Sequence, residues 1–259
     1  MRTYLVTGAG SGIGQATATL LAEQGHRVIG ADVKGSDIDC DLATADGRMA
    51  LVDLAGELAG GRLDGIIAVA GISAPTALTA SVNYFGMVAT LEGLRPYLAG
   101  SPAPRAVGVS STASLHPADP ALVDMMLAGD EPAALARAKE LEADPRLGYL
   151  IYSSSKEALA RWVRRSAPKR RWAGQSIPLN AIAPGVVETP MTKQLLSTPE
   201  GRELAFKSTP MPLNGPAAPP TAPARLLVWL ASEENTHLCG QVVFVDGGTD
   251  VLTRGDATW

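Results

Sequence analysis

A glycine-rich turn near the start of this 259-residue chain has the residue types that bind phosphate groups. Four glycines lie in the segment Thr7–Gly14, where a predicted strand passes directly into a predicted helix. Glycine lets such a turn tighten and lets a pyrophosphate approach the backbone, while the helix N-terminus offers free N–H groups to the phosphates. The turn therefore predicts a dinucleotide site, although a glycine-rich turn without a ligand has the same pattern. The residues assigned to this site are Gly8, Ser11, Gly12, Ile13 and Gly14.

A second chemical feature lies far downstream. Tyr152 and Lys156 are four residues apart in a predicted helix, so their side chains share one face. A free phenol has a pKa near ~10, and an ammonium group beside it in a dry cleft lowers that pKa. The phenol can then exchange a proton with an alcohol or a carbonyl group near neutral pH. Such a pair is common by chance, but together with a dinucleotide site it predicts hydride transfer with a nicotinamide cofactor.

Two more polar residues complete the predicted catalytic set. Ser111 follows a strand at the carboxyl edge of the sheet, where α/β folds bind ligands, and its hydroxyl can hydrogen-bond a substrate oxygen. Its neighbour Ser110 could take the same place. Asn83 lies inside a predicted helix, where asparagine is mildly unfavourable, and could hold a water molecule on the Lys156 side of a proton relay. The predicted catalytic residues are Asn83, Ser111, Tyr152 and Lys156.

The end of the second predicted strand carries an acidic residue, Asp32. A carboxylate there can accept hydrogen bonds from both ribose hydroxyls of the adenosine and repels a 2′-phosphate, so we expect NAD rather than NADP. A solvated turn carboxylate is the alternative. Asp41 and Leu42 could bind the adenine edge, and the backbone of Ala70 and Gly71 could lie against the cofactor. An ordinary turn and simple closure of the fold explain these four residues about as well.

The overall composition excludes several classes of function. The net charge is −4 and 46% of the residues are hydrophobic, so the chain lacks the basic field of a nucleic-acid-binding protein. No apolar run approaches the length that crosses a membrane. Cys40 and Cys239 have no paired spacing, and the chain enters a strand at once, which leaves no room for a signal peptide; we expect a cytoplasmic protein. The scattered histidines predict no metal site.

Short β-branched runs alternate with amphipathic stretches, which is typical of a parallel sheet covered by helices. We predict an α/β fold: a doubly wound, parallel, seven-stranded sheet of the Rossmann type in a single domain, residues 1–259. The predicted strands are Thr3–Thr7, Arg27–Ala31, Asp37–Cys40, Gly65–Ala70, Ala106–Ser110, Ile177–Ile182 and Gln241–Val245. The predicted helices are Ile13–Gln24, Arg48–Ala59, Val82–Leu98, Tyr152–Arg165 and Thr221–Ala231.

Two segments interrupt this alternation. Residues 115–148 separate a strand from the helix that should follow it, and helical signals over Pro120–Ala128 and Glu131–Glu142 predict an inserted helical pair before the catalytic helix. Residues 188–224 are rich in proline. Long loops inside a domain are commonly lids, and the apolar residues interspersed here predict a substrate lid with an apolar underside.

The motifs together resemble the short-chain dehydrogenase/reductase family over essentially the whole chain. The segment Thr7–Gly14 matches the TGxxxGxG turn of that family, and the predicted catalytic set matches its Asn-Ser-Tyr-Lys tetrad. The resemblance implies that Tyr152 and Lys156 also contact the cofactor, Lys156 by holding the nicotinamide ribose. Further contacts near the nicotinamide that the resemblance implies are Pro184, Gly185, Val187 and Thr189.

The long separation of Ser111 from Tyr152 is similar to that in the subgroup containing bacterial 3-alpha-hydroxysteroid dehydrogenase/carbonyl reductase. This resemblance implies an NAD(H)-dependent enzyme that interconverts a hydrophobic secondary alcohol and a ketone, steroid-like or another carbonyl compound. Its expected partners are a hydrophobic small-molecule substrate and further copies of the chain in a homodimer or other homo-oligomer, without nucleic acid or membrane. Two alternatives stay open: an allylic or aromatic alcohol dehydrogenase of the coniferyl type, and a non-catalytic NAD-binding sensor on the same fold.

Overall fold

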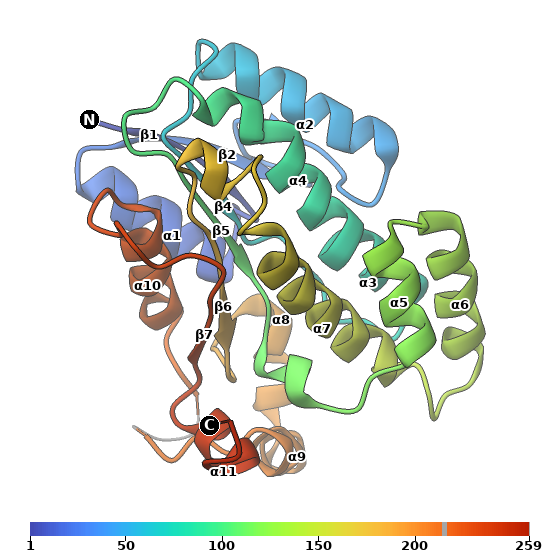
Figure 1. The fold of residues 1–259 in the computed structure, drawn as a ribbon. Helices are drawn as coiled ribbons and strands as arrows, with labels where there is room; N and C mark the ends of the chain where they lie inside the picture. The colour runs from blue at the N-terminus through green and yellow to red at the C-terminus, as the bar shows by residue number, and fades with distance from the viewer. Residues whose placement is uncertain (214–216, 259) are drawn as a thin grey trace.

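A parallel sheet forms the centre of the molecule in the computed structural model, which describes residues 1–213 and 217–258 (Figure 1). Within these residues the sheet has seven strands in the order β3-β2-β1-β4-β5-β6-β7. The order runs outward from β1 in both directions, which confirms the predicted doubly wound fold. The strands are β1 (Thr3–Thr7), β2 (Arg27–Asp32), β3 (Ile38–Asp39), β4 (Gly65–Ala68), β5 (Arg105–Val109), β6 (Leu179–Pro184) and β7 (Val242–Val245).

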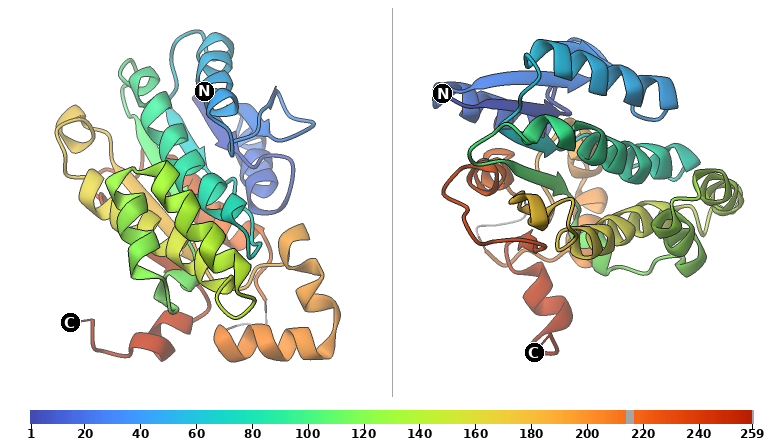
Figure 2. Two further views of the ribbon diagram at one scale, coloured as in Figure 1. Left: turned by 90° about the vertical axis from the view of Figure 1, so that its right-hand side faces the viewer. Right: turned by 45° about the horizontal axis from the view of Figure 1, so that its top comes forward.

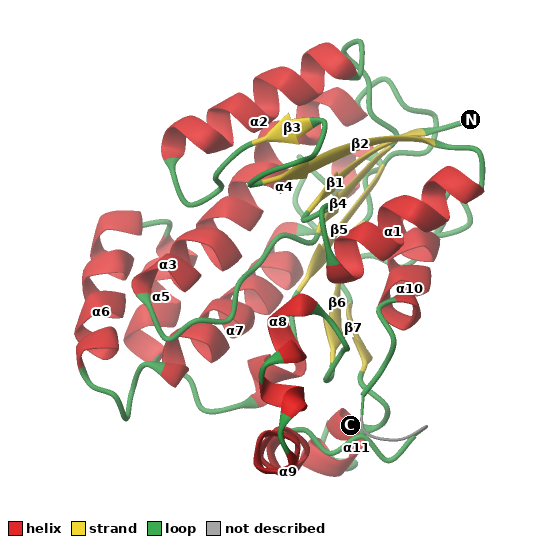
Figure 3. Cartoon of the chain, turned by 180° about the vertical axis from the view of Figure 1, so that it is seen from behind, coloured by secondary structure: helices red, strands yellow, loops and turns green. Residues whose placement is uncertain are grey.

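Helices cover both faces of the sheet, as Figure 3 shows. On one face lie α1 (Gly12–Glu23) and α10 (Thr221–Ala231), which pack on Tyr4 and Val6 of β1. On the other face lie α2 (Ala45–Leu58), α4 (Met87–Leu94) and α7 (Tyr149–Ser166), whose apolar side chains form one cluster with Leu5 of β1. Successive residues of a strand point to opposite faces, so a strand buried on both sides has to be continuously apolar.

The helix predicted over residues 82–98 is assembled from three shorter pieces: a π-helical turn (Ser81–Gly86), α4 and a 3₁₀ turn (Arg95–Leu98). The short helix α3 (Ala77–Ala80) comes directly before them. Proline in the 3₁₀ turn has no N–H to donate, which favours a change of helical geometry there. Helix α2 begins three residues before the predicted start, since the Thr44 side chain accepts a hydrogen bond from the Gly47 N–H and caps the helix.

The segment 115–148 follows a 3₁₀ turn (Thr112–Leu115) and contains two helices, α5 (Pro120–Ala128) and α6 (Glu131–Ala143). Asp119 and Asp130 cap these helices by accepting hydrogen bonds from backbone N–H groups in their first turns. Figure 2 shows that the pair lies outside α7, away from the sheet. Buried apolar residues of α5, among them Leu122 and Met126, join the same core cluster as α7.

The segment 188–224 forms one end of the molecule. It contains α8 (Pro190–Lys193), a 3₁₀ turn (Leu195–Ser197) and α9 (Pro199–Ser208), and α11 (Thr249–Arg254), near the C-terminus, contacts the 3₁₀ turn Thr112–Leu115 (Figure 1). Residues 214–216 of the predicted lid lie outside the described residues. A further 3₁₀ turn (Ala173–Gln175) precedes β6. In the part of the chain that the structure describes, no helix combines the length and apolarity needed to cross a membrane.

Candidate active site

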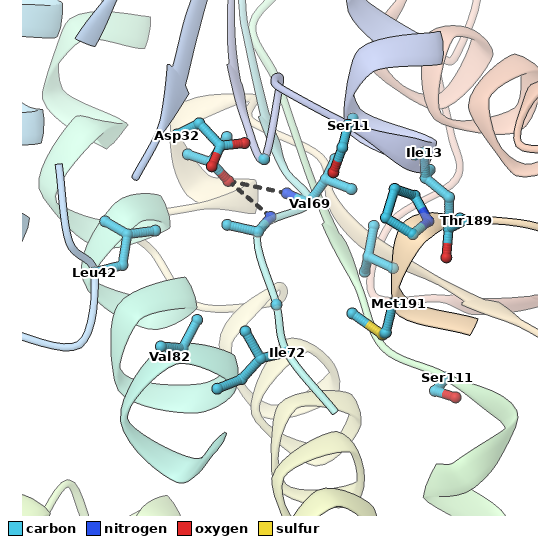
Figure 4. A pocket seen from close by; sticks show the side chains of 18 of the residues that line it. Ser11, Ile13, Asp32, Leu42, Val69, Ile72, Val82, Ser111, Thr189 and Met191 are labelled. Atoms are coloured by element: carbon cyan, nitrogen blue, oxygen red, sulfur yellow. Dashed lines mark hydrogen bonds between the residues drawn. The ribbon is translucent and has the colours of Figure 1, made fainter. Parts of the chain in front are cut away.

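A cavity of about 450 Å³ lies at the carboxyl ends of the strands. Every cofactor contact predicted from the sequence lines it, from the glycine-rich turn to Thr189, and so do Ser111, Tyr152 and Lys156. Figure 4 shows Asp32 and Leu42 at one end of this cavity, and Ser111 and Met191 toward the other. Asn83 is not among the lining residues, because it is fully buried behind them.

The turn between β1 and α1 has the shape that a bound diphosphate needs. A Cβ atom at Gly14 would collide with the carbonyl oxygen of Gly8. Gly8 has φ of 69°, and a Cβ there would lie 3.0 Å from the backbone of Ala70. The side chain of Ser11, the N-cap of α1, makes no capping hydrogen bond within the described residues. The turn therefore keeps the backbone bare and leaves N–H groups at the helix N-terminus for phosphate oxygens.

The end of the cavity that Asp32 and Leu42 line is negatively charged. Asp32 accepts hydrogen bonds from the N–H of Gly10 at 2.9 Å and from the N–H of Val33 at 2.7 Å, which fixes its carboxylate at the cavity wall. Asp41 accepts a hydrogen bond from the Ala43 N–H at 2.9 Å. Burial, together with the surrounding aspartates Asp32, Asp41 and Asp39, raises the pKa of the Cys40 thiol to about 11. A second negative group at this end would meet the same repulsion.

Tyr152, Lys156 and Ser111 come together at the other end. The Ser111 hydroxyl hydrogen-bonds Tyr152, and its oxygen also accepts from the Ala113 N–H at 3.1 Å. The Nζ atom of Lys156 lies 5.7 Å from the centre of the Tyr152 ring and donates to the Val109 carbonyl at 3.0 Å. The structure thus brings a phenol, a hydroxyl and an ammonium group together at one end of the cavity.

The pKa values at this end differ from the sequence-based expectation. The sequence predicted that Lys156 lowers the pKa of Tyr152. In the structure that pKa is raised, because burial raises it, while the hydrogen bond from Ser111 lowers it. Burial also lowers the pKa of Lys156 to about 8. The reason is that the ammonium group is itself desolvated and turns to the Val109 carbonyl, so that it stabilises the phenolate less than a direct contact would.

Asn83 lies in the π-helical turn, and most of the hydrogen-bonding capacity of its amide is taken up by protein groups. Its Oδ1 accepts from the Ile72 N–H at 2.8 Å, and its Nδ2 donates to the Ile72 carbonyl at 2.9 Å and to the Ser155 hydroxyl at 3.3 Å. One lone pair of Oδ1 is left for the expected water molecule. In the structure Asn83 fixes the loop after β4 against α7. Turns of π-helix are frequent at functional sites.

Several serines support the helix that carries Tyr152 and Lys156; of these, only Ser110 was considered from the sequence, as an alternative to Ser111. Ser110 donates to the Lys156 carbonyl at 2.8 Å, and Ser155 donates to the Tyr152 carbonyl at 2.7 Å. Ser153 donates to the Pro117 carbonyl at 2.5 Å, and Ser154 accepts from the Asp119 N–H at 2.9 Å. The helix that carries the phenol is thereby attached to β5 and to the inserted segment. Three consecutive serines inside a helix oppose helix propensity, and this could have indicated their role.

Fold and site together define an oxidoreductase of the Rossmann type. A family model described as Enoyl-(Acyl carrier protein) reductase matches residues 8–250, which is most of the chain. The chain belongs to the short-chain dehydrogenase/reductase family, whose members act on alcohol and carbonyl groups.

Individual relatives agree with this assignment. The chain is 35% identical over 261 residues to the 3-alpha-hydroxysteroid dehydrogenase/carbonyl reductase of Comamonas testosteroni, with 98% of both chains covered. The crystal structure of the 3-alpha-hydroxysteroid dehydrogenase from Pseudomonas sp. B-0831 complexed with NADH has a TM-score of 0.86 and 38% identity, covering 98% of this chain and 99% of that one. The RhlG/NADP active-site complex from Pseudomonas aeruginosa has a TM-score of 0.75 and 26% identity, with 96% of both chains covered.

Proposed function

We propose that this protein is an NAD(H)-dependent oxidoreductase that interconverts a hydrophobic secondary alcohol and a ketone. The observation that carries the proposal is the convergence of Tyr152, Ser111 and Lys156 at one end of a cavity whose other end holds Asp32. A nicotinamide cofactor bound along this cavity would accept the hydride in oxidation and supply it in reduction.

The protein residues handle the proton. In reduction the Tyr152 hydroxyl donates its proton to the carbonyl oxygen, and the raised pKa of Tyr152 keeps that proton in place at neutral pH. The Ser111 hydroxyl, which already hydrogen-bonds Tyr152, orients the same substrate oxygen. In oxidation the proton moves from the alcohol to the Tyr152 oxygen. Below pH 8 the Lys156 ammonium supplies a positive charge that favours the phenolate form of Tyr152, and it would hold the nicotinamide ribose of a bound cofactor.

The preference for NAD over NADP rests on charge. The Asp32 carboxylate is held at the cavity wall by the Gly10 and Val33 N–H groups, and it retains lone pairs for ribose hydroxyls. Asp39 and Asp41 add to the negative potential that raises the pKa of Cys40. A 2′-phosphate would bring about two further negative charges to this place. The relatives include an NADH complex and an NADP complex, so the preference is argued from these residues alone.

The apolar character of the substrate is supported by the reactive end of the cavity. Ile72, Leu78, Val187 and Met191 line the same cavity as the polar groups of Tyr152 and Ser111, and Figure 4 shows Met191 toward the Ser111 end. Such walls bind an apolar body and leave one oxygen for Tyr152 and Ser111. A steroid-like alcohol fits this description, and the hydroxysteroid dehydrogenases among the relatives favour it.

The two cysteines are unpaired in the structure, in keeping with the proposed cytoplasmic location.

The test replaces Tyr152 by phenylalanine, which removes the proton donor and keeps the ring. General acid–base groups contribute about 10²–10⁴-fold to rate, so kcat on a hydroxysteroid or cyclohexanol panel should fall by at least about a hundredfold. The dissociation constant of NADH should change less than about threefold. Tyr149→Phe is the matched control, because Tyr149 belongs to the same helix and is 60% exposed. Retained activity in Tyr152→Phe would overturn the proposal.

A further inference from the structure

Arg48, in the first turns of α2, connects the nearby Leu42 with two segments that are distant in the sequence. Its Nε donates to the Leu42 carbonyl at 2.7 Å, and one Nη donates to the Ser81 carbonyl at 3.2 Å. Its two Nη atoms also donate to both oxygens of Glu131 at 2.7 and 2.8 Å. The Arg48 side chain is only 11% exposed. Its donors are therefore committed to the protein, and its position depends on all three partners.

The first of these partners belongs to the cofactor cavity. Asp41 and Leu42 line the cavity at the end opposite Tyr152. Among the described residues, the Leu42 N–H has no protein acceptor in the hydrogen-bond network. The Thr44 N–H donates to the Asp41 carbonyl at 3.1 Å, which closes the turn. A donor and a carboxylate thus stand side by side, and the Arg48 bond to the Leu42 carbonyl holds them in place.

The second partner comes from the inserted segment. Glu131 is the first residue of α6, where a carboxylate interacts favourably with the helix dipole. Within the described residues it is the one carboxylate that forms an ion pair with Arg48. A cation that is this buried depends on its anion, because removal of one partner leaves an uncompensated charge. Without the Glu131 charge, Arg48 would gain free energy by turning toward solvent and would release the Leu42 carbonyl.

We propose that Glu131, acting through Arg48, is a positioning residue that sets the affinity of the site for the adenine half of the cofactor. The inserted helical segment is then part of the cofactor site, although none of its residues reaches the cavity. The inference rests on the proposed function, since it requires that a dinucleotide binds with its adenine at Asp41 and Leu42.

The experiment compares the two halves of the cofactor by titration calorimetry, with ADP-ribose and reduced nicotinamide mononucleotide as probes. Glu131→Gln keeps the size of the side chain and removes its charge. We expect its dissociation constant for ADP-ribose to rise about tenfold, while that for the mononucleotide changes less than about twofold. Glu140→Gln is the matched control, because Glu140 lies on the same helix and pairs with Arg137 at the surface. It should bind both probes as the wild type does.

A second variant keeps the test valid if the first one lowers stability. Arg48→Lys retains the charge but cannot reach three segments at once, so it should also weaken ADP-ribose binding selectively. Equal weakening of both probes, or no weakening, in variants that remain folded by circular dichroism would overturn the inference. If the wild type does not bind ADP-ribose, the proposed function fails, and this outcome is distinct from an unchanged affinity in Glu131→Gln.

Discussion

Lys156→Met should stabilise the protein while it removes the activity. The ammonium group of Lys156 is buried, with 4% of the residue exposed, and burial lowers its pKa to about 8 from an ordinary value of 10.5. The folded state is therefore destabilised as long as Lys156 carries its proton. Methionine has a similar length and no charge, so it fills the same space without that cost.

The size of the effect follows from the pKa. A pKa shift of one unit corresponds to about 1.4 kcal/mol, so the fall of the Lys156 pKa from 10.5 to about 8 means that the protonated lysine destabilises the folded state by about 3 kcal/mol. Loss of the hydrogen bond from Nζ to the Val109 carbonyl offsets about 1 kcal/mol of this gain. The variant should be more stable by about 2 kcal/mol at pH 7, which is a rise in Tm of about 4–8 °C for a chain of this size.

The effect has a defined pH dependence. The folded pKa lies below the unfolded value, so the unfolded state binds more protons between pH 8 and pH 10.5. The stability of the wild type relative to the variant is lowest below pH 8 and recovers as the pH rises toward 10.5.

Urea denaturation of both proteins at pH 7 and pH 10 measures the free energies of unfolding directly. Lys139→Met is the control, because Lys139 is exposed on α6 and should give no comparable gain. The reasoning is refuted if Lys156→Met is less stable than the wild type at pH 7, or if its gain does not change with pH.

Two further predictions concern the adenine end of the cavity. Asp32→Asn should lower the ratio of kcat/KM for NAD to kcat/KM for NADP by at least about tenfold, because the repulsion of a 2′-phosphate is reduced; steady-state kinetics with both cofactors measures it, and an unchanged ratio would contradict the charge argument. Cys40 should react slowly with a thiol reagent at pH 7, since burial and its acidic neighbours raise the pKa of the thiol to about 11. A Cys40→Ser variant gives the reaction rate of Cys239 alone. Rapid modification of both cysteines would contradict the raised pKa of Cys40.

That the glycine-rich turn and Asp32 line one cavity was predictable from the sequence, because the requirements of this edge are local. Gly8 and Gly14 are needed by the shape of one turn, and Asp32 follows from its place at the end of β2. The carboxyl ends of parallel strands meet at one edge, so strand order and strand ends suffice to bring these residues together. The same reasoning predicted Ser111 at the cavity. The structure distinguishes Ser111 from Ser110 by their hydroxyl groups, because that of Ser110 donates to the Lys156 carbonyl.

Other properties depend on neighbours that are distant in sequence. Burial lowers the pKa of Lys156, and its Nζ donates to the Val109 carbonyl; the spacing to Tyr152 reveals neither the burial nor this partner. The partners of Asn83 are Ile72 and Ser155, and the π-helical turn that directs its amide toward them interrupts a helix that looks regular in sequence. The pairing of Arg48 with Glu131 required the packing of α6.

The inserted segment is attached to the site at three separate points, which bears on what insertions can do in this fold. Its start is held by Ser153 of the catalytic helix, its middle by the ion pair of Glu131, and its end by Glu142, whose carboxylate accepts from the Ala77 N–H at 2.8 Å. A segment that only added surface would need none of these polar contacts. Because each contact ends on a residue next to the cavity wall, displacement of α5 and α6 would alter the adenine loop, the π-helical turn and the phenol together. The insertion is therefore expected to couple cofactor affinity to the position of the catalytic helix.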